Sequence, residues 1–348
     1  MTSSTSTSEP DAASARRFRR WAIVAASTFF GGAALLFVIL LAVDPYDSAR
    51  FPNLGIVGVS DNNLRTSNVS RARDQHFDTA IFGSSTGTAI DPNRLAAQTG
   101  LRITQLAFSH GDPPEILSVM DWFLAHHQHA ANVILMADDN WCSGDPALPQ
   151  RYPFPFWLYG SDAGYLGGLL NWKTFDRVVW RLQLAFGKRR PNDQVGYLPY
   201  HSDNEYVASP QIPPDLSEPE AAARFVWIER LASSLQRLPP GGSVQVVLTP
   251  AYFDFLPPPG SRQAERLDRC KRALSAVIAG PPGGARRGSF IDYRLDTPDM
   301  HVRADFYDRI HYRDPLARRI EDRMAAALAA RPAAAIQSDA RTNDASRP

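Results

Sequence analysis

The sequence predicts an α/β protein: a three-layer sandwich with a mostly parallel five-stranded sheet covered by helices on both faces, preceded by a transmembrane helix. Two observations support this prediction. Short apolar segments alternate with longer amphipathic ones between residues 78 and 329, which is typical of a parallel sheet buried on both faces. A single uncharged run, residues 21–43, lies ahead of this pattern.

The order of the elements follows from periodicity and from capping residues. Asp91 and Pro92 indicate the start of a short helix, and Gly100 indicates its end. The predicted strands are residues 78–82, 101–108, 132–137, 243–248 and 289–293. The other predicted helices are residues 113–127, 174–186, 219–238, 263–278 and 315–329.

Residues 21–43 contain no charged side chain. At about 1.5 Å per residue this helix reaches roughly 34 Å, enough to cross a hydrocarbon core of about 30 Å. Four arginines precede it and Asp44 follows it, so the positive-inside rule places the N-terminus in the cytoplasm. We therefore expect a single-pass inner-membrane protein whose C-terminal domain is periplasmic or extracellular. A cleaved signal peptide is the alternative, but its apolar region would be shorter, about 7–15 residues.

The remaining sequence divides by composition. Residues 1–20 are predicted to be a disordered cytoplasmic segment and residues 331–348 a disordered tail. Residues 44–330 form the predicted extracytoplasmic domain, which an aromatic-rich insertion interrupts at about residues 143–214. The insertion either covers a ligand site as a lid, or fills a small core or rests against the membrane interface.

Charge and cysteine content limit the classes of partner. The chain has 37 Lys and Arg against 36 Asp and Glu, so it presents no basic field for nucleic acid. Cys142 and Cys270 are the two cysteines; they form either one disulfide in an oxidising compartment or two buried thiols. No Cys and His spacing typical of a zinc site is present.

Two short motifs more than two hundred residues apart carry the chemistry. Gly83-Ser84-Ser85 directly follows the first strand, while Asp308 and His311 lie between the last strand and the last helix. Ligands bind at the carboxyl ends of parallel strands, where Ser85 is expected. A serine nucleophile needs a base, and the base needs an orienting carboxylate. The motifs predict Ser85 as nucleophile, His311 as base and Asp308 as its partner; a helix cap and a solvated loop are the structural alternative.

These motifs, together with Gly111 after the second strand and Asn140 after the third, resemble the SGNH (GDSL-type) hydrolase superfamily, whose sheet is flavodoxin-like. The likeness spans about residues 77–329. It implies an oxyanion hole made by the Ser85 and Gly111 backbone N–H groups and the Asn140 side chain. It also implies that no metal or organic cofactor is required.

The chain departs from the superfamily pattern in two blocks. Ser84 stands where the first block has an aspartate. The third block reads Ala-Asp-Asp-Asn at residues 137–140, and a strict alignment puts Asp139 in the asparagine position. A carboxylate there would repel an oxyanion, so Asn140 takes the role or the hole is weakened.

With its N-terminal anchor, the chain also resembles divergent SGNH-like proteins that modify extracytoplasmic polymers, among them the alginate O-acetylation proteins and the D-alanine transfer protein of teichoic acid synthesis. This resemblance implies a serine esterase or O-acyltransferase that acts on an acylated or acyl-accepting glycan, with partner proteins of an envelope acyl-transfer complex. The alternative is a non-catalytic scaffold or glycan-binding protein of an envelope polysaccharide assembly complex.

Overall fold

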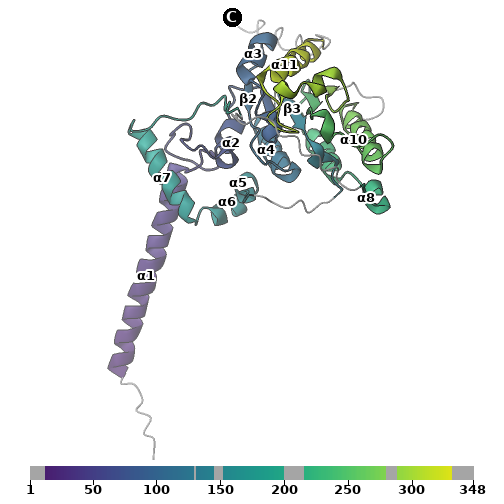
Figure 1. The fold of residues 1–348 in the computed structure, drawn as a ribbon. Helices are drawn as coiled ribbons and strands as arrows, with labels where there is room; N and C mark the ends of the chain where they lie inside the picture. Colours follow the sequence, from purple (N-terminus) through teal and green to yellow (C-terminus); the bar gives the residue numbers. More distant parts are fainter. Residues whose placement is uncertain (1–11, 129–130, 145–151, 200–214, 280–287, 331–348) are drawn as a thin grey trace, which may run out of the picture.

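A five-stranded, all-parallel sheet forms the centre of the computed structural model, which describes residues 12–128, 131–144, 152–199, 215–279 and 288–330 (Figure 1). The strand order is β2-β1-β3-β4-β5. Because β2 and β3 lie on opposite sides of β1, the chain reverses direction across the sheet there, and ligands bind at such a switch point. The strands are β1 Thr79–Gly83, β2 Ile103–Gln105, β3 Asn132–Ala137, β4 Ser243–Leu248 and β5 Gly288–Asp292.

Helices pack on both faces of the sheet. Ala80 and Phe82 belong to one apolar cluster with residues of α2, α4, α9 and α10, whereas Ile81 belongs to a second cluster with α3 and α11. Successive β1 side chains thus enter opposite cores, as the alternation along a strand requires. These helices are α2 Leu64–Ala72, α3 Pro92–Thr99, α4 Pro113–His126, α9 Val226–Leu235, α10 Arg262–Ala279 and α11 Asp314–Ala329.

The predicted helix at residues 219–238 is wrong as one element, because the chain forms α8 Glu218–Ala222 and then α9. Arg266 of α10 donates through Nη1 to the carbonyl oxygens of Glu220, Ala221 and Ala223. These carbonyls at the end of α8 thus accept a side-chain donor, and Ala223 leaves the helical conformation with a ψ of 146°.

The N-terminal helix is longer than predicted. Helix α1 covers Ala12–Val43, so residues 12–20, expected to be disordered, are helical. Its segment Ser14–Val43 is long and apolar enough to cross a membrane, and only 6% of its most apolar window is buried. The predicted disorder of residues 1–11 and of the tail at 331–348 lies outside the described residues.

Buried aspartates join α1 to the domain. Asp44 accepts hydrogen bonds from the Ser48 hydroxyl and the Tyr165 hydroxyl at 3.0 and 3.1 Å. Asp47 forms ion pairs with Arg73 and Arg181. Both aspartates have positive φ, 46° and 53°, a conformation that these contacts hold in place.

Aromatic side chains of the predicted insertion fill a core beside this junction. The segment contains α5 Phe156–Tyr159, α6 Asp162–Gly168 and α7 Trp172–Ala185. The rings of Trp157 and Tyr165 lie 6.1 Å apart, and Trp157 also packs on Tyr46, whose hydroxyl contacts Thr174 of α7 at 3.1 Å. Residues 145–151 and 200–214 of the predicted insertion lie outside the described part.

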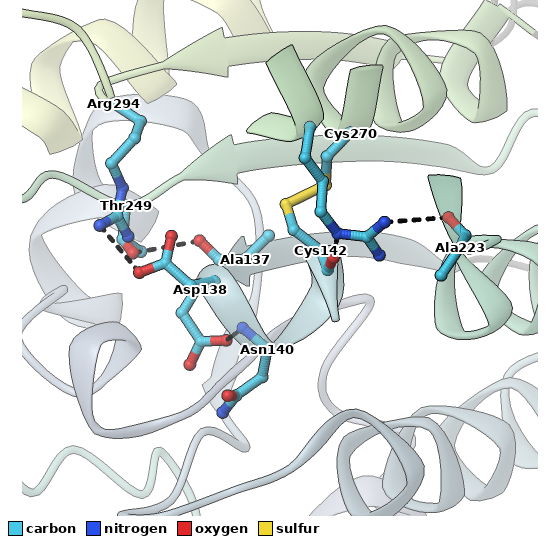
Figure 2. Close-up of a disulfide and its surroundings, with 10 residues drawn as sticks. Ala137, Asp138, Asn140, Cys142, Ala223, Thr249, Cys270 and Arg294 are labelled. Carbon is cyan, nitrogen blue, oxygen red and sulfur yellow. Dashed lines mark hydrogen bonds and ion pairs between the residues drawn. A yellow bond between two sulfur atoms is a disulfide. The ribbon is translucent and has the colours of Figure 1, made fainter. Parts of the chain in front are cut away.

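A disulfide joins Cys142 to Cys270, which decides between the two alternatives left open by the sequence (Figure 2). Cys142 ends the short 3-10 helix η2 Asp139–Cys142 that follows β3, and Cys270 lies on α10. The bond therefore ties the carboxyl edge of β3 to a helix of the neighbouring layer. Arg266 adds a second tie, because its Nε donates to the Cys142 carbonyl at 2.9 Å.

We predict that the double variant Cys142→Ala, Cys270→Ala loses stability because its unfolded chain is no longer constrained across 128 residues of sequence. A loop of this size corresponds to a loss of about 3–5 kcal/mol in the free energy of unfolding. Urea unfolding with and without dithiothreitol measures it: the reductant should destabilise only the wild-type protein. Equal stability of reduced and oxidised wild-type protein would contradict the structural role of this bond.

Candidate active site

Ser85, His311 and Asp308 lie in one hydrogen-bonded chain. The Oγ atom of Ser85 is 2.7 Å from His311 Nε2, and His311 Nδ1 is 2.6 Å from Asp308 Oδ2. The serine and the histidine are 226 residues apart in sequence. The structure thus brings together the three side chains that the sequence predicted, in the order hydroxyl, imidazole, carboxylate.

The nucleophile turn is held against β3 and against the histidine loop. Ser85 begins the 3-10 helix η1 Ser85–Gly87, directly after β1. A Cβ atom on Gly83 would lie 2.9 Å from Met136 Cβ, so glycine allows the turn to approach β3. From the other side, the buried Tyr312 hydroxyl donates to the Thr86 carbonyl oxygen at 2.6 Å. The residue after the histidine therefore fixes the residue after the serine.

Asp308 orients the imidazole and its own loop. Its Oδ1 accepts the backbone N–H groups of Ile310 and His311 at 2.9 and 2.8 Å, and its Oδ2 faces the imidazole. Burial opposes ionisation of Asp308, but these hydrogen bonds outweigh it and lower the carboxyl pKa. A charged carboxylate favours a proton on Nδ1, which leaves Nε2 able to accept the serine proton.

A cavity of about 260 Å³ opens beside the serine. Its walls include four of the predicted site residues, Ser85, Gly111, Asn140 and His311. Of the described residues 152–199, none lines it. Trp157 and Tyr165 belong to the core described above, whereas the Tyr152 ring packs on the cavity residue His110, with the ring centroids 5.0 Å apart. Within the described residues, no three His, Cys, Asp or Glu side chains are grouped as metal ligands.

The three residues predicted to donate to an oxyanion line this cavity, and they differ in whether their N–H groups already have an acceptor. Gly111 donates its N–H to the Phe108 carbonyl at 3.2 Å, so this donor is engaged in the present conformation. The Asn140 side chain makes one long contact, 3.4 Å from Nδ2 to Asp112 Oδ1, and its amide carries a second N–H. Asn140 and the Ser85 backbone N–H are therefore the donors best suited to an anion.

Asp139 is paired with a cation. Its Oδ2 lies 3.1 Å from Nη1 of Arg294, whose side chain is only 1% exposed. The pair balances the negative charge that a strict alignment would place at the oxyanion. Sequence reasoning missed Arg294, although its place two residues after β5 puts it at the same edge of the sheet.

Asp138 supplies a carboxylate to the nucleophile turn. Its Oδ2 accepts the Ser84 hydroxyl at 2.6 Å, and its Oδ1 accepts the Asn140 N–H at 3.1 Å. The carboxylate beside Ser84 therefore comes from the residue that directly follows β3. Desolvation raises the pKa of Asp138 to about 6, against the lowering effect of the Ser84 hydrogen bond. Sequence reasoning did not predict this contact.

We predict that Asp138→Asn weakens the pH dependence of stability. Between pH 3.8 and about 6, native Asp138 keeps a proton that the unfolded chain releases, so stability falls as the pH rises through this window. The rise in pKa corresponds to about 2–3 kcal/mol in the free energy of unfolding. Asparagine does not ionise, and its amide can still bond to both Ser84 and Asn140.

Urea unfolding of the wild-type protein and the variant at several pH values between 4 and 7 tests this expectation. The difference between the two proteins isolates Asp138 from Glu115, whose pKa burial also raises, to about 7. Parallel pH profiles for the two proteins would show that the Asp138 carboxyl titrates normally.

Comparison with known proteins adds no relative. No protein-family model matches the chain, and no curated protein matches it.

Proposed function

We propose that this protein is a membrane-anchored, extracytoplasmic serine esterase or O-acyltransferase of SGNH type that acts on an acylated or acyl-accepting glycan. The observation that carries the proposal is the 2.7 Å contact between Ser85 Oγ and His311 Nε2, with Asp308 on the other imidazole nitrogen. A hydroxyl within hydrogen-bond reach of an oriented base is the arrangement that nucleophilic acyl chemistry needs.

The proposed reaction has two halves. In the first, His311 Nε2 takes the Ser85 proton while Oγ bonds to the ester carbonyl carbon. The Ser85 N–H and the Asn140 amide stabilise the resulting oxyanion, and Asp308 stabilises the imidazolium. The C–O bond to the alcohol then breaks, and His311 returns the proton to the leaving oxygen. In the second half, water or an acceptor hydroxyl gives its proton to His311 and attacks the acyl carbon. The bond from that carbon to Ser85 Oγ then breaks, and His311 passes the proton to Oγ, which restores the free serine.

The proposed location rests on α1 and on the disulfide. The segment Ser14–Val43 can cross a membrane by length and composition, and arginines lie near its N-terminal end. The bond between Cys142 and Cys270 suits an oxidising compartment. We therefore place the anchor in the inner membrane and the domain on its periplasmic or extracellular side, where partner proteins of an envelope acyl-transfer complex would supply acyl groups.

The assignment to the SGNH superfamily is part of this proposal. It is supported by helices packed on both faces of the sheet, by a serine directly after β1 and by an Asp-x-x-His block before α11. In this interpretation the α5–α7 segment is the aromatic insertion, and it supports the junction with α1.

A non-catalytic scaffold or glycan-binding protein is the second candidate. One observation favours it: the Gly111 N–H donates to Phe108 and is not directed at an oxyanion. A scaffold would retain the fold and the cavity but would form no acyl-enzyme.

We predict that an alkyl fluorophosphonate probe labels the wild-type protein and does not label Ser85→Ala. Ester turnover by this variant should fall by a factor on the order of 10⁴–10⁶, as expected when the nucleophile is removed. Ser84→Ala is the matched control, because it removes the adjacent hydroxyl and should keep the labelling. Labelling of Ser85→Ala but not of Ser84→Ala would show that Ser84, and not Ser85, is the nucleophile. A folded wild-type protein that is not labelled at all would favour the scaffold.

We also predict that Asp308→Asn lowers kcat by a factor on the order of 10²–10⁴ and leaves KM within a few-fold, because the amide no longer holds the required tautomer or stabilises the imidazolium. Steady-state kinetics with an activated ester measures the two constants separately. A rise in KM at unchanged kcat would instead place Asp308 in substrate binding.

A further inference from the structure

A second, larger cavity lies next to the serine cavity. Its volume is about 480 Å³, which is within the range of small-molecule sites. The two cavities share three wall residues, Asp139, Phe255 and Arg294. The two cavities therefore adjoin at these side chains, and Ser85 lies in the smaller of the two.

The second cavity is mainly apolar, in contrast to the serine cavity. Its apolar side chains come from the segment after β4, from α10 and from the chain before α8, and they include Phe253, Leu256, Pro257, Leu267 and Leu216. An apolar surface that remains open to solvent in a folded domain is typical of a site for an apolar ligand group.

Arg294 lines both cavities. Its Nη1 pairs with Asp139, while its buried Nε and Nη2 atoms have no hydrogen-bond partner within the described part of the chain. Buried N–H groups without partners are costly, and both atoms are closed to solvent in this conformation. The centroid of the Phe255 ring lies 5.8 Å from Cζ of Arg294, and this ring is an apolar part of the wall that both cavities share.

We propose that the second cavity binds a medium-length aliphatic acyl chain of the ester that Ser85 attacks. This inference rests on the proposed function and narrows its substrate class from any acyl ester to one with an acyl group longer than acetyl. The alcohol half of the proposed substrate is a polar glycan hydroxyl, so the apolar cavity suits the acyl half.

Hydrolysis of p-nitrophenyl acetate, butyrate, hexanoate and octanoate by the full-length protein tests the proposal. Each methylene transferred into the cavity should raise kcat/KM by up to about fourfold. Octanoate has six more methylenes than acetate, so it is expected to exceed acetate by a factor of up to about 4,000. A second series, ethyl to octyl acetate, varies the alcohol half. A flat acyl series, or a preference that follows the alcohol chain, would overturn the assignment.

Leu256→Trp fills the second cavity without touching the triad. It should lower kcat/KM for octanoate at least about tenfold and change acetate less than about twofold. Leu198→Trp is the matched control, because Leu198 is exposed and lines neither cavity. Phe253→Ala, which removes a half-exposed ring from the cavity wall, gives a second test that does not risk overpacking.

Binding separates this inference from the proposed function. Sodium octanoate and sodium acetate are titrated calorimetrically into full-length Ser85→Ala protein, which needs no turnover. Octanoate should bind at least about tenfold more tightly than acetate, and Leu256→Trp, but not Leu198→Trp, should remove the difference. Equal binding of both acids overturns the acyl cavity. Preferential binding of octanoate, together with a lack of fluorophosphonate labelling of the wild-type protein, overturns only the esterase.

Discussion

The hydrogen bond between Ser85 and His311 is the interaction on which the proposed site depends, and the whole sheet is needed to make it. The serine leaves β1 near the start of the domain, while the histidine belongs to the loop before the last helix. Their contact requires the carboxyl ends of the parallel strands to share one edge. Tyr312 then fixes the remaining distance by donating to Thr86. The alignment of base and nucleophile is thus a property of the fold as well as of two side chains.

Much of the scaffold could be predicted from local signals. The strands β3 and β4 have the predicted bounds, because each is a buried apolar run. The start and end of α3 followed from Asp91 and Gly100. The Asp91 side chain accepts the first free N–H groups of the helix, and Gly100 adopts the left-handed conformation that ends it. The triad residues were predictable because each ends or follows an element at the same edge of the sheet.

Other features depend on tertiary contacts that no local pattern contains. Helix α2 was not predicted, because its buried face carries Asn68 and Arg71, whose side chains bond to Leu106 and Ser67. The break between α8 and α9 is caused by an arginine of α10. The role of Arg294 depends on its pairing with Asp139, which is 155 residues away in sequence. Apolar periodicity can be read from a single sequence. The partner of a buried polar side chain cannot, because that partner can lie far away in the chain.

The edge of the sheet also concentrates acidic side chains at the place where the proposed chemistry creates negative charge. Asp112, Asp138 and Asp139 all line the serine cavity. Arg294 balances Asp139, and the raised pKa of Asp138 favours its neutral form at mildly acidic pH. The proposed chemistry should therefore depend on how far the charges of these aspartates are compensated, and not only on Ser85, His311 and Asp308.

The buried aspartates after α1 have a consequence for the geometry of the whole molecule. Leu40 and Val43 are buried, and Asp47 is bound to arginines of two different segments, so the helix enters the domain without a slack linker. If α1 lies in a bilayer, the catalytic edge keeps one height and one orientation above the lipid surface. Any substrate would then have to reach the site at that fixed distance from the membrane, so its own position relative to the bilayer would limit access as much as the shape of the cavity does.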